Sequence, residues 1–273
     1  MSGNADIPDG IIHRRLRIPV HSRSNAAIAI VTGAGSGIGR EIAIALATHQ
    51  WTVGVNDLDA AQAGQTLQLI YDAGGSAVVL DGDIGHWPTV EQIFSSIKQT
   101  CGTPTLLVNN AGVQTWASLA DLSPEQWSKT LNTNLTGCFL MTKCFATTAP
   151  AGSSIINIGS GCNKLAFPKL IDYTAAKGGI EMFTKSSALD LGPQGVRVNC
   201  IAPGAIATDR TAAETADYND RWAALTPLQR IGTPQDIANA VLLLADERAG
   251  FITGQTINVD GGLFSRAIWP DSY

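Results

Sequence analysis

The chain has 273 residues, of which 45% are apolar and 15% are charged. This composition is typical of a packed globular protein. The length suffices for one large α/β domain or two small ones. The formal net charge is −5 and the acidic residues are scattered, so the sequence lacks the basic stripe that nucleic acid or an anionic membrane would require. We therefore expect neither partner.

The cysteines and the N-terminal residues bear on the redox compartment and on targeting. The cysteines are odd in number and include no C-x-x-C pair, so neither a disulfide framework nor a metal site is expected. They are Cys101, Cys138, Cys144, Cys162 and Cys200. Residues 1–25 contain no apolar stretch long enough for a signal peptide or a membrane span. We expect a loose N-terminal arm, with a transit peptide as a minor alternative, and a reducing cytoplasm.

From Ala26 onward, short β-branched runs alternate with longer segments of helical period, and no linker interrupts them. This alternation predicts a single βαβ-repeating domain over residues 26–263, with an α/β, Rossmann-type, doubly wound parallel sheet. Its seven strands are expected at residues 27–32, 52–56, 77–80, 105–109, 154–158, 196–201 and 256–259.

Two helix starts are predicted from capping patterns. Ser123-Pro-Glu-Gln126 combines an N-cap hydroxyl, a proline at the first helical position and a side chain that reaches back, and Thr233-Pro-Gln-Asp236 repeats the device. Residues of about 208–230 show no clean periodicity and follow a strand, where α/β folds place ligand-covering segments. We expect a mobile lid there and a separate tail over residues 264–273.

A glycine-rich turn stands between a strand and a helical pattern. The strand Ala27–Val31 is followed by Thr32-Gly-Ala-Gly-Ser-Gly-Ile-Gly39, and a helical pattern begins at Arg40. Such glycines let backbone N–H groups approach a pyrophosphate at a helix N-terminus. The sequence therefore predicts a dinucleotide site, although glycine-rich turns that bind nothing also occur.

Asp57 stands eighteen residues beyond Gly39, where an acidic residue can bind the adenosine ribose. A carboxylate accepts hydrogen bonds from the ribose hydroxyls and repels a 2′-phosphate. No Arg or Lys occupies position 36 or follows Asp57 directly, so NAD is expected rather than NADP. The alternative is that Asp57 or Asp59 only caps the following helix.

Tyr173 and Lys177 are four residues apart in a helical segment that continues to about Leu191. This spacing places the phenol and the ammonium on one helix face. At about 4 Å and an effective dielectric near 20, the cation would stabilise the phenolate by roughly 4 kcal/mol. A Tyr–Lys pair alone is common on solvated helices, but Ser160 follows the apolar strand Ile155–Ile158 and should emerge at the ligand-binding edge of the sheet.

These motifs occur in the order and spacing of a known family. The segment Thr32–Gly39 fits T-G-x-x-x-G-x-G, Asn109–Gly112 is N-N-A-G, and Tyr173 with Lys177 forms Y-x-x-x-K. From Ala26 to about Leu263, the chain resembles a standard-length member of the short-chain dehydrogenase/reductase family. The resemblance implies an NAD-dependent oxidoreductase that transfers hydride directly between substrate and nicotinamide, and it implies no metal.

The resemblance also implies roles for individual residues. Tyr173 would move the substrate proton, and Lys177 would favour its phenolate and bind the nicotinamide ribose. Ser160 would orient the substrate oxygen, and Asn134 in Asn134-Leu-Thr-Gly137 would hold a water in a proton relay through Lys177. The residues expected to bind the cofactor are Gly33, Ser36, Gly37, Ile38, Gly39, Asp57, Asp83, Ile84, Asn110, Ala111, Gly112, Tyr173, Lys177, Pro203, Gly204, Ile206 and Thr208.

Substrate and assembly are predicted from weaker features. Gln114, Asn163 and Lys164 are expected near the pocket and favour a hydroxylated ligand, so a sugar or polyol is predicted. Trp116 and Trp222 could border the same pocket. The alternatives are a 3-oxoacyl-thioester reductase and a non-enzymatic dinucleotide sensor, against which the complete catalytic set argues. By resemblance, we also expect a homotetramer built through the helices that start near residues 123 and 173.

Overall fold

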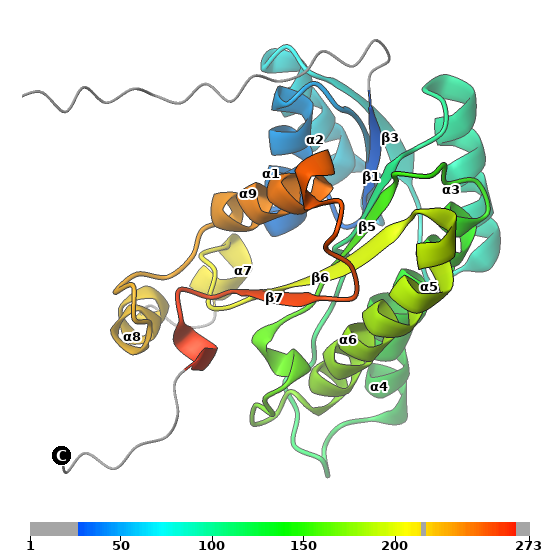
Figure 1. Ribbon diagram of the computed structural model, residues 1–273. Coiled ribbons are helices and arrows are strands. Elements are labelled where there is room, and N and C mark those ends of the chain that lie inside the picture. The colour runs from blue at the N-terminus through cyan, green and yellow to red at the C-terminus, as the bar shows by residue number, and fades with distance from the viewer. Residues whose placement is uncertain (1–26, 214–216, 266–273) are drawn as a thin grey trace, which may run out of the picture.

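Seven parallel strands form one sheet in the computed structural model, which describes residues 27–213 and 217–265. The strand order is β3-β2-β1-β4-β5-β6-β7 (Figure 1). The strands are β1 (Ile28–Val31), β2 (Thr52–Asp57), β3 (Ser76–Asp81), β4 (Leu106–Asn109), β5 (Ser154–Ile158), β6 (Arg197–Pro203) and β7 (Thr256–Val259). The predicted seven-stranded, single-domain Rossmann-type sheet is confirmed.

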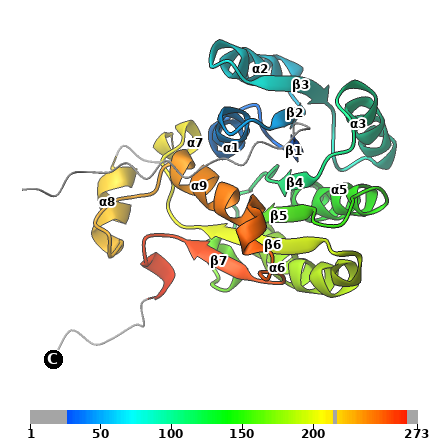
Figure 2. The same ribbon diagram turned by 45° about the horizontal axis from the view of Figure 1, so that its top comes forward.

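Helices cover both faces of the sheet (Figure 2). One face carries α1 (Gly37–Thr48), α2 (Ala60–Asp72) and α9 (Pro234–Ala245). The other face carries α3 (Trp87–Thr100), α5 (Gly137–Ala146) and α6 (Ile171–Leu191), with α4 (Pro124–Leu131) packed on α6. Two short helices, α7 (Asp209–Ala212) and α8 (Tyr218–Leu225), lie beyond the carboxyl end of β6.

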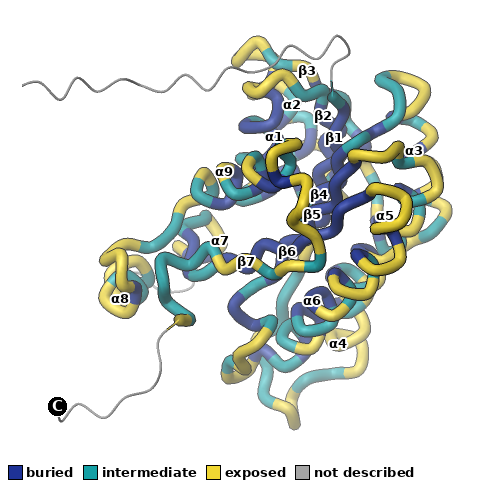
Figure 3. The backbone as a smooth tube through the Cα atoms, in the orientation of Figure 1, coloured by how far each residue is buried: buried dark blue, intermediate teal, exposed yellow. Residues whose placement is uncertain are grey.

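The central strands are buried because they present apolar side chains to both helical layers, whereas β7 at the edge of the sheet is partly exposed (Figure 3). In β1, Ala29 and Val31 face the layer of α1, α2 and α9, whereas Ile28 and Ile30 face the opposite layer. This follows from the two-residue period of a strand, and it explains why parallel strands appear in sequence as continuous apolar runs. Each fully buried Ile or Leu contributes roughly 1.5–3 kcal/mol.

The position of the ligand site follows from the strand order. Strand β1 pairs with β2 on one side and with β4 on the other, so the chain changes direction across the sheet at this point. The connections after β1 and β4 therefore run to opposite faces and leave a crevice at the carboxyl ends of the strands. The glycine-rich turn, Asn110 and Ser160 all lie at this edge.

Both predicted capping boxes are present. The Ser123 hydroxyl accepts from the Gln126 N–H at 3.2 Å, and the Gln126 side chain accepts from the Ser123 N–H at 3.0 Å. Thr233 and Asp236 form the same arrangement at the start of α9. Strand β6 ends at Pro203, two residues later than expected, because Val259 of β7 pairs with Pro203.

The expected lid, residues of about 208–230, contains α7 and α8, although residues 214–216 lie outside the described ones. The predicted N-terminal arm, and the tail beyond residue 265, also fall outside them. Within the described residues, no helix is long and apolar enough to cross a membrane. Over the same residues, no group of three or more His, Cys, Asp or Glu side chains could hold a metal ion.

Candidate active site

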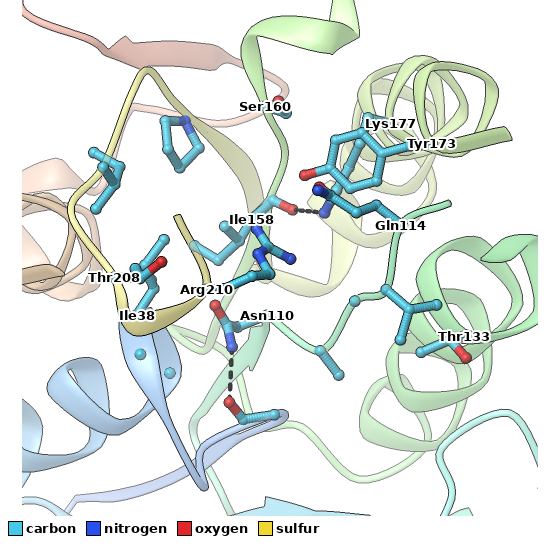
Figure 4. A pocket seen from close by; sticks show the side chains of 18 of the residues that line it. Ile38, Asn110, Gln114, Thr133, Ile158, Ser160, Tyr173, Lys177, Thr208 and Arg210 are labelled. Carbon is cyan, nitrogen blue, oxygen red and sulfur yellow. Dashed lines mark hydrogen bonds between the residues drawn. The ribbon is translucent and has the colours of Figure 1, made fainter. Parts of the chain in front are cut away.

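A cavity of about 720 Å³ opens at the carboxyl edge of the sheet (Figure 4). Its volume lies within the ordinary range for ligand pockets. Side chains from the turn after β1 and from the ends of β2, β3, β4, β5 and β6 line it, together with Tyr173 and Lys177 of α6. Every residue predicted at the site lines this cavity except Asn134. The fold thus joins segments that are far apart in the sequence.

The turn after β1 has the shape that a diphosphate requires. Gly37 has φ +53°, which disfavours other residues, and α1 begins at this residue. A Cβ atom at Gly39 would lie 2.1 Å from the Gly33 carbonyl oxygen and 2.4 Å from Asn110 Nδ2, so only glycine fits there. The N-terminus of α1 faces the cavity with unpaired N–H groups and favours an anion. These residues fit the diphosphate of a nicotinamide dinucleotide.

The N-N-A-G segment fixes this turn in place. Asn110 Nδ2 donates to the carbonyl oxygens of Thr32 at 2.9 Å and Gly33 at 3.1 Å. In return, the Thr32 hydroxyl accepts from the backbone N–H groups of Asn110 and Ala111, both at 3.0 Å. The turn is therefore held rigidly before any ligand binds.

The preceding asparagine, Asn109, belongs to a buried network between strands. Its Nδ2 donates to Asn157 Oδ1 at 2.9 Å, and Asn157 Nδ2 donates to the Thr184 hydroxyl of α6 at 2.9 Å. Buried hydrogen bonds between side chains favour one arrangement of the elements that carry them. This network links β4, β5 and α6, and therefore sets the position of α6 relative to the glycine-rich turn.

Asp57 ends β2 beside the glycine-rich turn. Its Oδ2 accepts from the Gly35 N–H at 2.8 Å, and its Oδ1 accepts from the Asp59 N–H at 3.0 Å. Asp59, by contrast, caps α2 by accepting from Ala61 and Gln62. The capping role therefore belongs to Asp59, whereas Asp57 lines the cavity and keeps lone pairs for further hydrogen bonds.

Arg40 contacts the glycine-rich turn near Asp57, which sequence reasoning missed. Its guanidinium donates to the Gly35 carbonyl oxygen, to the Thr66 hydroxyl at 3.0 Å and to the Gln65 side chain at 3.3 Å. These contacts direct it to the outer side of the turn, and it does not line the cavity.

Tyr173 and Lys177 share one face of α6 and both line the cavity. Lys177 is only 3% exposed, and its Nζ donates to the Ile158 carbonyl oxygen at 2.7 Å. The same Nζ lies 5.5 Å from the centroid of the Tyr173 ring. Figure 4 shows both side chains beside Gln114. The two side chains therefore bring a positive charge and a phenol to the same part of the cavity.

Ser160 emerges directly after β5, as predicted, and lines the same cavity. Its hydroxyl oxygen accepts from the Cys162 N–H at 3.2 Å, which leaves the hydroxyl hydrogen available for a ligand oxygen. Cys162 also lines the cavity, but burial raises the pKa of its thiol. The thiol is therefore neutral near pH 7 and is a poor nucleophile.

Asn134 is the predicted site residue that the cavity does not include. It is 1% exposed, and its side chain binds the Val113 backbone through both polar atoms, at 2.7 Å and 2.9 Å. It lies in a π-helical turn, Asn132–Thr136, between α4 and α5. The contact holds Val113 and, through the backbone, the cavity residue Gln114.

The wall of the cavity includes aromatic side chains. Trp116 and Trp222 line it, as expected, and so does Gln114. Asn163 and Lys164, which were expected near the pocket, do not line the cavity. Asn163 is used within the turn after β5, where its Oδ1 accepts from the Ser160 N–H at 3.0 Å. Lys164 is directed to Glu181, 4.0 Å away.

Three further lining residues had no sequence signal, namely Phe167, Arg210 and Phe264. The rings of Phe167 and Phe264 meet edge to face, with centroids 5.8 Å apart. A Cβ atom at Gly161 would lie 2.1 Å from the Phe264 ring, so this glycine lets the ring close on the turn after Ser160. Only tertiary contacts bring these residues together.

Comparisons with known proteins agree over nearly the whole chain. A family model described as enoyl-(acyl carrier protein) reductase matches residues 33–264. The (3R)-3-hydroxyacyl-CoA dehydrogenase of Rattus norvegicus is 35% identical over 89% of this chain and 98% of its own. The 3-oxoacyl-(acyl-carrier-protein) reductase of Staphylococcus epidermidis is 34% identical over 86% and 98%. A gluconate 5-dehydrogenase from Burkholderia cenocepacia, solved in complex with NADP and tartrate, has a TM-score of 0.82 with 31% identity over 90% and 98%.

The fold, the glycine-rich turn and the Ser–Tyr–Lys end of the cavity define an oxidoreductase that uses a nicotinamide dinucleotide and acts on hydroxyl or carbonyl groups. Because the family model covers most of the chain and the relatives match almost end to end, the membership is clear. The chain belongs to the short-chain dehydrogenase/reductase family.

Proposed function

We propose that the protein is an NAD-dependent dehydrogenase that interconverts a hydroxyl and a carbonyl group on a sugar or polyol. The observation that carries this proposal is that Ser160, Tyr173 and Lys177 line one cavity with the glycine-rich turn and Asp57. An alcohol held between Ser160 and Tyr173 would therefore stand in the same space as a dinucleotide bound along that turn.

The protein residues manage the substrate proton. In oxidation, the Ser160 hydroxyl donates a hydrogen bond to the substrate oxygen, and the Tyr173 phenolate removes its proton. The C–H bond breaks as the C=O bond forms, and Tyr173 ends protonated. The nicotinamide, when bound, takes up the hydride. Lys177 supplies a positive charge next to the Tyr173 ring, and its hydrogen bond to Ile158 holds the ammonium in place.

In the proposed proton relay, Asn134 holds a water next to Lys177. The proton from Tyr173 would pass through Lys177 and this water to solvent. The contacts of the Asn134 side chain with Val113 support a positioning role for this residue in addition. A water on this path would have to share polar groups that Val113 already uses.

The preference for NAD is proposed from Asp57 alone. A 2′-phosphate beside this carboxylate would be repelled, and the contacts of Arg40 with Gly35, Thr66 and Gln65 direct its charge elsewhere. The relative from Burkholderia cenocepacia was solved with NADP, so cofactor preference varies among similar chains. The ratio of kcat/KM with NAD to that with NADP tests the proposal, and Asp57→Asn should lower this ratio at least tenfold.

The substrate class is supported by Gln114 at the reacting end of the cavity and by the likeness to a gluconate dehydrogenase. The aromatic wall favours the rival class, acyl thioesters, for which the relatives from Rattus norvegicus and Staphylococcus epidermidis are named. A third class, a dinucleotide sensor without turnover, would need none of the proton-transfer residues.

The deciding experiment measures initial rates of NADH formation by the purified chain with aldoses, polyols and 3-hydroxyacyl thioesters. We expect turnover of a sugar or polyol that Tyr173→Phe lowers at least about 100-fold while NADH binding, followed by fluorescence, stays unchanged. Turnover of thioesters alone would establish the rival class. Absence of turnover in both reaction directions with intact NADH binding would favour the sensor.

A cytoplasmic location is proposed as well. Within the described residues all five cysteines are free, which suits a reducing compartment.

A further inference from the structure

The cavity contains an arginine to which no part of the proposed chemistry assigns a role. Arg210 stands in α7, two residues after Thr208, and lines the cavity. In Figure 4 its guanidinium extends away from Ile38 and Thr208, toward the side where Tyr173 and Gln114 lie. The side chain therefore extends from the edge of the dinucleotide site in the direction of the reacting end.

No hydrogen bond or ion pair joins Arg210 to any residue that the structure describes. In the open cavity, water solvates the guanidinium. A dinucleotide and a substrate would displace much of that water, and removing a charged group from water is unfavourable unless a partner of opposite charge replaces it. A ligand that fills the cavity should therefore bring an anion to Arg210.

Among the described residues, no carboxylate serves this purpose. Asp57 and Asp83 line the cavity at the ends of β2 and β3, the adenosine side, and Asp57 is held by Gly35 and Asp59. Asp209 also lines it, but it precedes Arg210 in α7, where successive side chains point about 100° apart. No ion pair joins Asp209 to Arg210 within the described chain.

The other cations of the cavity have different surroundings. Lys177 is bound to the Ile158 carbonyl oxygen. Lys129 lies in the last turn of α4. Asn132, three residues later, donates through its amide to the carbonyl oxygen of Gly85, which follows β3. Lys129 is therefore close in sequence to a residue that contacts the β3 side of the cavity. Unlike Lys177, Arg210 has no hydrogen-bond partner among the described residues, and it extends toward the reacting end, where the glycine-rich turn and the start of α1 are not available to bind an anion.

From this arrangement we propose that Arg210 binds the carboxylate of the substrate, so that the enzyme acts on a hydroxy acid. A guanidinium matches a carboxylate with two parallel N–H···O bonds, which fixes orientation as well as charge. The reacting hydroxyl then lies at Ser160 and Tyr173, the carboxylate lies at Arg210, and Phe167 and Phe264 cover the apolar faces of the carbon chain. This inference rests on the proposed function and narrows its substrate class.

The first test compares acids with neutral molecules of the same shape. Initial rates with NAD are measured for gluconate and gluconamide, and for 3-hydroxybutyrate and its amide. The wild-type protein should prefer at least one acid over its amide, and Arg210→Ala should reduce that preference about 10- to 100-fold, the range expected for a lost charged hydrogen bond. Arg210→Lys should recover part of it.

The matched control is Arg221→Ala. Arg221 is an exposed arginine of α8 that does not line the cavity and faces Asp217 at 3.9 Å. It belongs to the same expected lid and carries the same charge, so its removal controls for the net charge and for lid packing. We expect the acid-to-amide preference of this variant to equal that of the wild type.

A binding readout separates the two anions that could reach Arg210, the substrate carboxylate and the cofactor diphosphate. NADH affinity is measured by fluorescence titration, and binding of gluconate or 3-hydroxybutyrate is then titrated into NADH-loaded Tyr173→Phe protein, with and without Arg210→Ala. The proposal predicts a larger loss of acid affinity than of NADH affinity. Loss of NADH affinity alone would assign Arg210 to the diphosphate and overturn the proposal.

Failure of this inference differs from failure of the proposed function. If the wild type oxidises neutral sugars or polyols with NAD but never prefers an acid over its amide, the dehydrogenase stands and the role of Arg210 is wrong. If NADH-loaded protein binds an acid through Arg210 but no substrate turns over, the role of Arg210 stands and the dehydrogenase does not.

Discussion

The buried ammonium of Lys177 carries a testable consequence for the proton chemistry. Lys177→Met keeps the length and the packing of the side chain but removes the ammonium that donates to the Ile158 carbonyl oxygen next to the Tyr173 ring. We expect kcat/KM to fall at least 100-fold at pH 7, because the proposed proton transfer at Tyr173 loses the positive charge beside it. Initial rates with NAD and the best substrate measure this, and Lys177→Arg, which keeps a cation, should recover part of the rate. An unchanged rate would contradict the role.

Residues whose role depends on local spacing were accessible from the sequence. Tyr173 and Lys177 are one helical turn apart, and the glycines of the turn after β1 follow their strand directly. By contrast, the sequence did not show that the Asn163 side chain is used by the turn after β5, where its Oδ1 accepts from the Ser160 N–H. Arg210 had no signal at all, since its place in the cavity depends on the path of the chain after β6.

At the scale of elements, the cap of α9 is joined to the end of the expected lid. Arg230 donates to Asp236 through two bonds of 2.8 Å and 2.9 Å, and the Thr233 N–H donates to Asp236 Oδ2 at 2.8 Å. The hydrogen bonds from Arg230 hold the pKa of the Asp236 carboxyl well below its usual range, and the contacts with Thr233 act in the same direction.

This arrangement predicts a pH-dependent loss of stability in Asp236→Asn. A depressed folded-state pKa contributes stability above the unfolded pKa of about 3.9, and that contribution disappears as the pH falls through the folded value. Because the pair is partly solvated, we expect a loss of only about 1 kcal/mol at pH 7, which shrinks below pH 4. Urea unfolding at pH 7 and pH 3 measures it, with Asp190→Asn on the exposed face of α6 as the control. An equal loss at both pH values would contradict the mechanism.

Element boundaries that depend on tertiary packing were not accessible from the sequence. The strand starts and both capping boxes follow from local patterns, but the π-helical turn Asn132–Thr136 does not. A Cβ atom at Gly137 would lie 2.7 Å from the Ile84 side chain. This glycine therefore lets Ile84, in the segment that follows β3, pack against the π-helical turn. Such turns are frequent at functional sites. Here it places Asn134 against Val113.

At the scale of the molecule, large apolar side chains remain exposed on two groups of elements. On α5 and α6, Phe139 is 44% exposed, Met182 is 60% exposed and Leu189 is 81% exposed. The second group is α9 and the segment between α9 and β7. Leu243 of α9 is 69% exposed there, and Phe251 of that segment is fully exposed. Exposed apolar groups of this size on defined elements are typical of subunit interfaces.

Two separate apolar surfaces can each form an isologous contact, and two such contacts at different places on a subunit generate a tetramer. We therefore expect light scattering at micromolar concentration to give four times the 28.6 kDa mass of the chain. Leu189→Glu should break the contact through α6 and leave dimers, because a buried unpaired carboxylate is strongly unfavourable. Leu69→Glu, a matched change at a 44% exposed leucine of α2, should remain tetrameric. A wild-type mass equal to one chain would exclude the assembly, and a tetramer unaffected by Leu189→Glu would exclude this surface from it.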